Sequence, residues 1–585
     1  MKEELSRLLA QALQSLPPGT LPDPVDGTSI SIERTRDSTH GDYTSNIALR
    51  LARAARSAPR ALAEAIAAAM PPSALVAGVE VAGPGFLNFR ISPAAQQTVV
   101  LRVLQAADRY GESQLGQGRR VLLEYVSANP TGPLHVGHGR QAAYGATLAN
   151  LLAATGHHVQ REYYINDAGR QMDILTVSTW VRYLQRCGES IAFPANGYRG
   201  DYVHQIAAQL YARRGTALQR AAHSVMNGLP PDAPEGDKEQ HIDALIERMR
   251  SLLGAEATRE VHELSLGQML ADIRSDLTEF GVQFDRWYSE RELTDSGAVE
   301  RAIATLRAAG HLYEKDGALW FRASRFGDDE DRVLVRANGQ HTYFAPDIAY
   351  HLQKCERGFE RLIDVLGADH HGYVARVRGA LMAMGQPAER LEACLIQFVS
   401  LFRDGQKIPM GKREAQFVTL RQLREEVGND ACRLFYLMRS HDQHLDFDLT
   451  LARSRSNENP VYYIQYAHAR VASVMKQLAA RSLAYDGALA AEHLALLDSA
   501  HEQAVTRELA RFPEILEQAA SARAPHALVH YLRELANTFH TWYNAATILS
   551  EDVALRQARL ALALALQQVV RNGLTLLGVS APESM

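Results

Sequence analysis

The chain has 585 residues, 46% of them hydrophobic and 22% charged, with a formal net charge of −5, which is typical of a soluble globular protein of about three to four domains. This acidic balance excludes a generally basic nucleic-acid-binding surface, so any RNA contact must come from local patches. The four cysteines form no C-x-x-C pair, which argues against a zinc knuckle or a disulfide framework and fits a reducing cytosol. No segment has the uninterrupted apolar character of a signal peptide or a membrane span, so we expect neither export nor membrane insertion.

The pattern of apolar and turn-forming residues over 1–112 predicts a small α/β domain. The expected elements are an amphipathic first helix, a Pro/Gly/Asp break over 17–27, a strand near 30–33 and a helix over 43–56. A later strand places Phe86 and Asn88 on one face, where an aromatic ring beside an amide could stack on an unpaired base and hydrogen-bond to it. The alternative is that Phe86 and Phe89 belong to the core, and we prefer this for Phe89.

The central stretch of the chain runs over 121–144 and reads VLLEYVSANPTGPLHVGHGRQAAY. It predicts a buried strand over 121–126, a Pro/Gly turn, and a helix that begins at Leu134 or His135, a geometry that binds phosphate at the helix N-terminus. Neither G-x-x-x-x-G-K-[ST] nor G-x-G-x-x-G occurs here. Instead, His135 and His138 lie on one face of the first turn, beside free backbone N–H groups. The alternatives for an isolated H-x-x-H are half of a metal site or two packing histidines.

The remaining chain predicts a second parallel strand over 158–165, an insertion at about 188–330, and a further strand over 362–366. Pro346 suits the first position of a helix and puts Asp347 in its first turn. Asp369 and the two histidines after it are metal-ligand types, but three consecutive side chains do not converge on one ion, so no metal site is expected. Residues 401–419 form a basic Gly-containing loop, and the pattern from 420 onward is helical.

The central stretch resembles the HIGH signature of class I aminoacyl-tRNA synthetases, and its longer form SANPTGPLHVGH resembles arginyl-tRNA synthetases in particular. The resemblance covers essentially the whole chain. It implies a multidomain α/β protein: a small α/β N-terminal additional domain over 1–112, a Rossmann-type parallel-sheet catalytic core over 113–400 with the insertion, a connecting region over 401–455, and an all-α DALR-type anticodon-binding bundle over 456–585. Other family boxes stand at 163–171, 198–202, 284–290, 342–350, 430–433 and 456–470.

The resemblance also implies a two-step reaction with L-arginine, ATP and tRNA(Arg), Mg²⁺ bound mainly through the ATP phosphates, and a monomer. The implied catalytic residues are His135, His138 and Lys412. The implied ATP-binding residues are Pro130, Gly132, His135, Gly137, His138, Gly367, Asp369, Met410 and Lys412. The implied arginine-binding residues are Glu124, Ser127, Asn129, His138, Tyr343, Asp347 and His370. The implied tRNA-binding residues are Phe86, Asn88, Tyr463, Arg470, Tyr543 and Met585.

The basic loop departs from the family's K-M-S-K-S consensus. The aligned residues 409–412 read PMGK, which keeps the second lysine and loses the first lysine and the serine. We therefore assign the phosphate chemistry of the loop to Lys412, with Lys407 or Arg413 as helpers. The alternative is an ordinary solvated charged loop.

The choice of arginine should depend on acids, because a guanidinium is always charged and presents a planar fork of donors. Glu124 lies in an otherwise apolar strand, where a carboxylate is costly unless a cation pairs with it. We predict that Glu124 and Asp347 meet the substrate guanidinium together with Tyr343. The alternative for Glu124 is a salt bridge to an internal arginine or lysine.

The C-terminal helices hold slightly fewer Lys and Arg than Asp and Glu, so they are not a generic basic RNA binder. We expect exposed aromatic residues, including Phe539, Trp542 and Tyr543, to stack on unpaired anticodon bases. Two other functions remain possible: a nucleotidyltransferase of the same HIGH superfamily, and a paralogue that binds tRNA or amino acid without catalysis.

Overall fold

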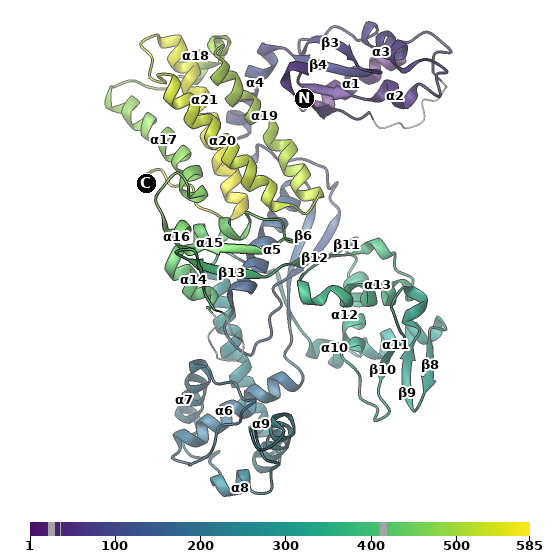
Figure 1. The fold of residues 1–585 in the computed structure, drawn as a ribbon, viewed down its shortest axis with the longest axis vertical. Coiled ribbons are helices and arrows are strands. Elements are labelled where there is room, and N and C mark those ends of the chain that lie inside the picture. Colours follow the sequence, from purple (N-terminus) through teal and green to yellow (C-terminus); the bar gives the residue numbers. More distant parts are fainter. Residues whose placement is uncertain (22–29, 36, 410–417) are drawn as a thin grey trace.

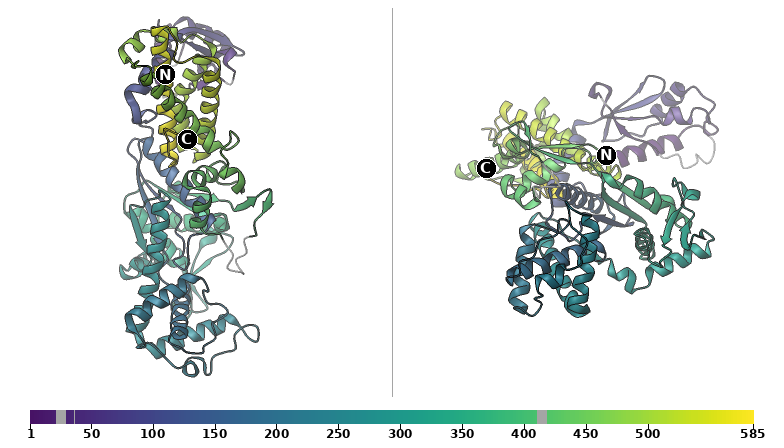
Figure 2. Two further views of the ribbon diagram at one scale, coloured as in Figure 1. Left: turned by 90° about the vertical axis from the view of Figure 1, so that its left-hand side faces the viewer. Right: turned by 60° about the horizontal axis from the view of Figure 1, so that its bottom comes forward.

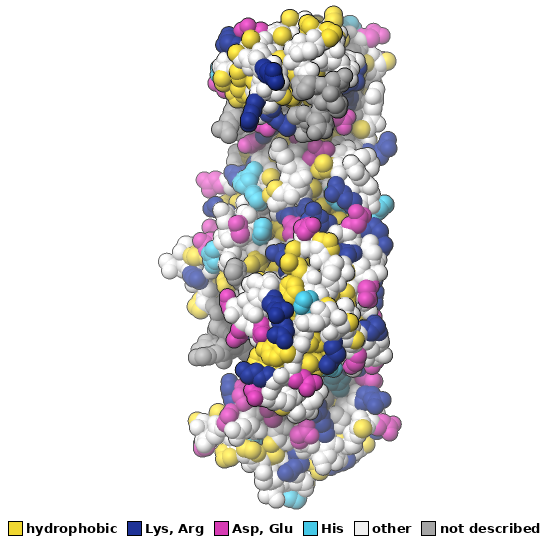
Figure 3. Space-filling model, turned by 90° about the vertical axis from the view of Figure 1, so that its right-hand side faces the viewer, with side chains coloured by type: hydrophobic (Ala, Val, Ile, Leu, Met, Phe, Trp, Pro, Cys, Tyr) yellow, Lys and Arg dark blue, Asp and Glu magenta, His cyan; other side chains and the backbone are white. Residues whose placement is uncertain are grey.

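The computed structural model describes residues 1–21, 30–35, 37–409 and 418–585 (Figure 1). The molecule is elongated, and the left view of Figure 2, turned by a quarter turn from Figure 1, shows the same long axis. The N-terminal domain and the C-terminal helices lie at one end, and the helices of the first insertion lie at the other. On the face shown in Figure 3, positive and negative side chains are interspersed along the whole length.

The centre of the molecule is a five-stranded parallel sheet in the order β12-β11-β5-β6-β7. Its strands are β5 (Arg120–Tyr125), β6 (His158–Ile165), β7 (Arg286–Ser289), β11 (Arg361–Gly367) and β12 (Leu391–Ile396). The strand order reverses between β5 and β11, and the carboxyl edge at such a reversal is where doubly wound sheets bind ligands. Helix α5 (Val136–Ala154) follows β5 and packs on the sheet, as predicted for a Rossmann-type core.

The span predicted as one insertion contains a strand of the main sheet. Strand β7 pairs in parallel with β6, so the chain returns to the sheet at 286–289 and two separate additions result. The first contains α6 (Arg170–Arg186), α7 (Asp201–Arg214), α8 (Ala222–Met226) and α9 (Lys238–Glu279). The second contains α10 (Arg291–Asp295), α11 (Ala298–Ala308), the antiparallel strands β8 (Leu312–Lys315), β9 (Ala318–Phe321) and β10 (Arg332–Val335), and leads into α12 (Phe344–Glu356) and α13 (His371–Ala383). The four-residue strand β7 is too short for its apolar pattern to stand out in the sequence.

The N-terminal domain is built on an antiparallel sheet in the order β1-β2-β4-β3. Tyr43 begins strand β2 and not the predicted helix over 43–56, because Tyr43 and Ser45 both point into the core and pair with β4. A short helix follows at α2. The elements are α1 (Lys2–Gln14), β1 (Glu33–Arg34), β2 (Tyr43–Ser45), α2 (Ile47–Leu51), α3 (Pro59–Ala68), β3 (Val76–Ala82) and β4 (Phe86–Ile91).

The C-terminal bundle includes one helix from the other end of the sequence. Helix α4 (Pro93–Ala106) follows the N-terminal domain in the chain and packs against α19 and α21 of the bundle. Helix α21 is long and apolar enough to cross a membrane, but 72% of its most apolar 18-residue stretch is buried inside the protein. The bundle helices are α17 (Pro460–Ala480), α18 (Gly487–Glu492), α19 (Ala500–Ser521), α20 (Pro525–Ala545) and α21 (Val553–Leu577).

A small connecting region joins the core to the bundle. Its sheet has the order β14-β13-β15, and the buried Arg433 donates to the carbonyls of Leu577 (2.8 Å) and Phe280 (3.0 Å). The DALR-type box is therefore a structural joint between α9, α15 and α21. The elements of the region are β13 (Val399–Arg403), β14 (Gln406–Lys407), α14 (Leu420–Val427), α15 (Asn429–Tyr436), β15 (Leu445–Asp448) and α16 (Leu449–Arg453).

Candidate active site

The turn after β5 has a strained backbone. Val126 and Ser127 both have positive φ, 69° and 39°, and the Ser127 N–H donates to the Tyr125 carbonyl at 3.0 Å. A buried β-branched residue in this region is rare and costs about 1–3 kcal/mol. The strain turns the Ser127 hydroxyl back under the sheet edge, where it donates to Glu124 Oε1 at 2.9 Å and accepts from the Tyr164 N–H at 3.0 Å.

Glu124 has an internal cation. The Nζ atom of Lys354 lies 2.6 Å from Glu124 Oε2 and 2.9 Å from Asp364 Oδ1, and Lys354 is fully buried. The alternative considered for Glu124, a salt bridge to an internal lysine, is therefore correct. The argument that Glu124 lacks a cation until a substrate arrives is wrong, because α12 brings Lys354 to it from 230 positions along the chain.

Two other acids at the same edge retain an unbalanced charge. Burial raises the pKa of Asp347 to about 6, with a further contribution from the charge of Glu124. Burial raises the pKa of Glu290 to about 7, and repulsion from Asp347 and Asp167 adds to this. Within the described ranges, no lysine or arginine forms an ion pair with either acid. Such a pair of acids provides the acceptors that a buried guanidinium requires.

Glu290 was not among the predicted site residues, although its box was noted. Its position in the chain could have indicated it, because Glu290 directly follows the carboxyl end of β7. The polar residues that follow β5, β6 and β7 all lie at the same edge of the sheet. Tyr164 lies among the acids, since burial and the charges of Glu290, Asp347 and Glu124 all raise its pKa. Tyr343 is the N-cap that precedes α12, and its side chain is 73% exposed, so the described conformation does not enclose it.

A chain of amides lies beside these acids. Asn129 donates to Gln171 Oε1 at 3.0 Å, and Asn166 and Asn129 lie 3.1 Å apart. With its amide group turned over, Asn166 donates to Glu290 Oε2 at 2.7 Å. The Asn166 amide therefore lies between the predicted residue Asn129 and Glu290, and its orientation decides which of the two it donates to.

The two histidines cap the helix that follows β5. His135 is the N-cap of α5: its Nδ1 accepts from the N–H groups of Gly137 (3.1 Å) and His138 (3.4 Å), and His138 Nδ1 accepts from the His135 N–H (3.3 Å). The two rings stack with centroids 3.6 Å apart. A Cβ at Gly137 would lie 2.9 Å from the His135 ring, so this glycine makes room for the cap. The prediction that both imidazoles share one face of the first turn is confirmed, but the N–H groups expected to be free there are occupied by the cap.

The segment that follows the basic loop returns to this helix end. Thr419 forms a bridge with His135, and the Leu420 N–H donates to the Leu134 carbonyl at 2.8 Å. The predicted residues Met410 and Lys412, and the helper Arg413, lie outside the described residues. Lys407 is exposed at the end of β14, just before them.

The other predicted ATP-binding residues border the same edge. Pro130 is buried, and Gly132 lies under Tyr202, whose hydroxyl donates to the Thr131 carbonyl at 2.7 Å. Gly367 ends β11, and Asp369 and His370 follow it with exposed side chains. The core thus brings residues from β5, β11 and the start of α5 to one place.

Three of the predicted tRNA-binding residues converge between α17 and α20. The Arg470 guanidinium lies over the rings of Tyr466 (4.4 Å) and Tyr543 (4.8 Å), and Tyr463 packs on His540 at 4.6 Å. Phe539 and Trp542 are fully buried, so their predicted exposure is wrong: they lie on the face of α20 that points into the bundle.

Met585 and the N-terminal residues lie apart from this group. Met585 is half exposed and lines a cavity of about 440 Å³ with Tyr462 and Asn459. Phe86 is 37% exposed, but Asn88 is 7% exposed and lines a cavity of about 170 Å³ with Glu80 and other residues. The two side chains share the outer face of β4, and Phe89 is in the core, as predicted.

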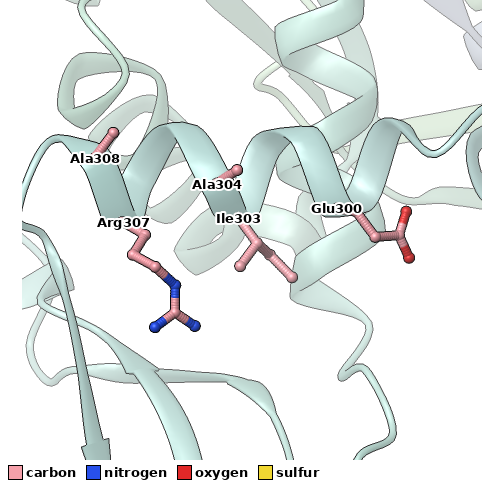
Figure 4. A pocket seen from close by; sticks show the side chains of 5 residues that line it. All are labelled: Glu300, Ile303, Ala304, Arg307 and Ala308. Carbon is pink, nitrogen blue, oxygen red and sulfur yellow. The ribbon is translucent and has the colours of Figure 1, made fainter.

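A further depression of about 440 Å³ lies along α11 (Figure 4). Its lining side chains come from this one helix, and the view shows Arg307 and Glu300 more than a turn apart with Ile303 between them. No set of polar groups converges there, so it lacks the character of a reaction site.

Comparisons with known proteins agree with this geometry. Residues 3–91 match the family model described as arginyl tRNA synthetase N terminal domain, residues 99–192 match tRNA synthetases class I (R), catalytic domain, and residues 464–585 match DALR anticodon binding domain. The arginine–tRNA ligase of Thioalkalivibrio sulfidiphilus is 56% identical over 587 aligned positions, with 100% of both chains covered. The chain belongs to the arginine–tRNA ligase family. The arginine–tRNA ligase of Halorhodospira halophila is 54% identical with the same coverage.

Solved structures share the fold of this arginine–tRNA ligase family member. The structure named putative arginyl t-RNA synthetase, from Campylobacter jejuni, superposes with a TM-score of 0.73 at 29% identity, and the match covers 85% of this chain and 100% of that one. The Thermus thermophilus arginyl-tRNA synthetase superposes with a TM-score of 0.76 at 24% identity over 100% of both chains. The predicted family and fold class are confirmed.

Proposed function

We propose that this chain activates L-arginine with ATP and transfers the arginyl group to the 3′-terminal adenosine of tRNA(Arg). In the first step, an arginine carboxylate oxygen attacks the α-phosphorus of ATP, and the bond to the pyrophosphate leaving group breaks. In the second step, the terminal 2′-OH attacks the carbonyl carbon of the arginyl-adenylate and AMP leaves. Neither step needs a covalent protein nucleophile, so positioning and cationic groups carry the catalysis.

The acid pair Asp347 and Glu290 supports arginine as the amino acid. Each carboxylate is costly in the empty protein, and a bound guanidinium offsets that cost by supplying charge and planar donors. Ser127 and Asn129 follow β5 and would hold the α-amino and carboxylate groups, with His138 and His370 at the same edge. Glu124 would act through Ser127, and Tyr343 would have to turn inward to reach the substrate.

ATP would lie over the N-terminus of α5. The positive end of the helix dipole and the His135–His138 pair favour the triphosphate. Pro130, Gly132, Gly137, Gly367 and Asp369 border this place, and Met410 and Lys412 would approach from the basic loop. Mg²⁺ is expected to arrive with the phosphates, because this ion keeps several waters and takes ligands from its substrate.

The tRNA would contact both the C-terminal helical bundle and the N-terminal domain. The group of Tyr463, Arg470 and Tyr543 suits unpaired anticodon bases, which are recognised by stacking and edge contacts. Met585 would add to that contact, while Phe86 and Asn88 would meet the tRNA elbow. We further propose that the protein acts as a monomer in the cytoplasm, without a membrane partner.

The deciding experiment is ATP–pyrophosphate exchange in the presence of tRNA, with L-arginine and L-citrulline compared at equal concentrations. Citrulline keeps the shape of arginine and removes its charge, so the acid pair should support exchange with arginine alone. Equal exchange with both amino acids would reject the pocket assignment. Exchange with neither, while tRNA still binds, would favour the non-catalytic paralogue.

A further inference from the structure

A row of acidic residues crosses the sheet beneath the arginine pocket. In the parallel register, Asp364 of β11 stands opposite Glu124 of β5, and Glu124 stands opposite Glu162 of β6. All three side chains are buried. Adjacent buried carboxylates repel each other, so the row requires cations that enter from one side.

Helix α12 and the residue directly after it supply two cations, and Arg286 of β7 lies 4.0 Å from Glu162 as a third. Lys354 bridges Glu124 and Asp364, and Arg357, one turn later, grips Glu162 with its two terminal nitrogens at 3.0 and 2.5 Å. The same helix carries Asp347 in its first turn. One helix therefore neutralises two positions of the row and also presents an acid that has no internal cation.

The acids that Lys354 and Arg357 hold differ in their other hydrogen-bond partners. Glu162 accepts from the Tyr350 hydroxyl (2.8 Å) and lies 4.0 Å from Arg286, and its described hydrogen bonds do not include Ser127. Glu124 turns its second oxygen to the Ser127 hydroxyl, and Ser127 in turn holds the Tyr164 N–H. Lys354 thus holds the acid that accepts from the Ser127 hydroxyl, whereas Arg357 holds an acid that faces Tyr350.

We propose that Lys354 is a positioning residue of the arginine site: it fixes Glu124 as the acceptor of the Ser127 hydroxyl and reserves Asp347 and Glu290 for the substrate guanidinium. This inference rests on the proposed function. Without the ammonium, three unbalanced acids would face one singly charged substrate, and the turn after β5 would lose the anchor that holds its strained conformation. Lys354 itself does not touch the substrate.

The charge balance makes the role measurable as a pH effect. In Lys354→Met, the adjacent carboxylates of Glu124 and Asp364 lose the ammonium between them and keep only His351 beside Asp364, so uptake of a proton by the pair is favoured, and the Ser127 hydroxyl loses its charged acceptor. Raising the pH removes that proton and restores the acceptor. The titratable and charged groups around the Glu124 carboxylate are Lys354, Asp347 and Tyr350 of α12, Asp364 of β11, Glu162 and Tyr164 of β6, and Tyr373 of α13, with His351 bonded to Asp364.

The test measures arginine KM, kcat and calorimetric Kd between about pH 6 and 9, where buried acids titrate, for the full chain with tRNA. We expect Lys354→Met to raise arginine KM and Kd about tenfold near neutral pH, or about 1.4 kcal/mol, and to approach the parent as pH rises. The control Arg357→Met removes the cation that directly follows helix α12, whose side chain is 17% exposed where that of Lys354 is fully buried. It should lower the melting temperature and leave the pH profile of arginine binding unchanged.

A second pair of variants keeps the test decisive if Lys354→Met does not fold. Glu124→Gln and Asp364→Asn each remove one carboxylate from Lys354, and only Glu124→Gln should raise arginine Kd about tenfold. Equal effects of these two variants, or a pH-independent loss shared by Lys354→Met and Arg357→Met, would reduce Lys354 to a structural role. If the parent binds arginine but does not catalyse exchange, the proposed function fails, while the Kd values still decide the role of Lys354.

Discussion

Replacing Asp347 by asparagine should stabilise the empty enzyme while it weakens arginine binding. Burial raises the pKa of Asp347 from its ordinary value of 3.8 to about 6. Because the folded-state pKa is the higher one, this group's contribution to stability is complete below about pH 4 and is lost as pH rises through about 6. Above that pH the charged carboxylate therefore opposes folding, and Asp347→Asn removes the charge with little change of shape.

The magnitude follows from the two pKa values. A difference of about two corresponds to about 3 kcal/mol, which is an upper limit because water can relax around the site. We expect a gain of about 1–2 kcal/mol at pH 8 that disappears toward pH 4. Arginine binding should weaken by about 2–5 kcal/mol, as expected when one partner of a buried charge pair is lost, with ATP affinity little changed.

The assay is thermal or urea unfolding of the parent and Asp347→Asn at pH 5 and 8, two values that lie on either side of the raised pKa of about 6. The Kd for arginine is measured by calorimetry on the same two proteins. Asp295→Asn is a suitable control, since Asp295 is an exposed acid at the end of α10. A variant that is less stable than the parent at pH 8, or equally displaced at both pH values, would refute the reasoning. An unchanged arginine Kd would remove Asp347 from the guanidinium site.

Three other outcomes are expected. Lys412→Ala should slow adenylate formation by about 10²–10³ and weaken ATP binding far less, since a loop lysine meets charge that develops in the transition state; an unchanged kcat in single-turnover kinetics would move the role to Lys407 or Arg413. Removing residues 1–91, which leaves α4 in the bundle, should raise KM for tRNA and spare arginine binding, and an unchanged tRNA KM would end the elbow assignment. Glu514→Gln should also raise tRNA KM at constant arginine KM, because Glu514 of α19 holds Lys2 (3.1 Å), Arg34 (3.0 Å) and Tyr43 (3.0 Å) of the N-terminal domain; equal tRNA KM values would show that this contact does not orient the domain.

The parts of the site that could be predicted are local in sequence. The strand, turn and capped helix around His135 lie within about two dozen residues, and their turn chemistry and periodicity specify them directly. The prediction that Asp347 lies in the first turn of α12 is confirmed, although the helix begins at Phe344 and Pro346 is its third residue, not its first as predicted. In these segments the neighbours along the chain determine the conformation.

The parts that could not be predicted depend on partners far apart in sequence. Lys354 lies on a helix whose pattern says only that one face is buried, and nothing near Glu124 indicates which cation reaches it. Phe539 and Trp542 stand on an amphipathic helix where aromatic residues suit either face, and the bundle buried both. Strand β7 was hidden inside a helical insertion, and with it the position of Glu290.

Helix α4 has a mechanical consequence. It is the only covalent route from the N-terminal domain to the rest of the chain, and its packing against α19 and α21 leaves little slack for that domain to swing. Glu514 is a second, non-covalent attachment. Together the two attachments hold the surface that faces the tRNA elbow and the surface that faces the anticodon at a fixed distance from each other. On the proposed assignment, a tRNA with a different distance between elbow and anticodon would contact one of these surfaces but not both. The overall dimensions of the tRNA would therefore be selected before its 3′ end reaches the acids of the catalytic sheet.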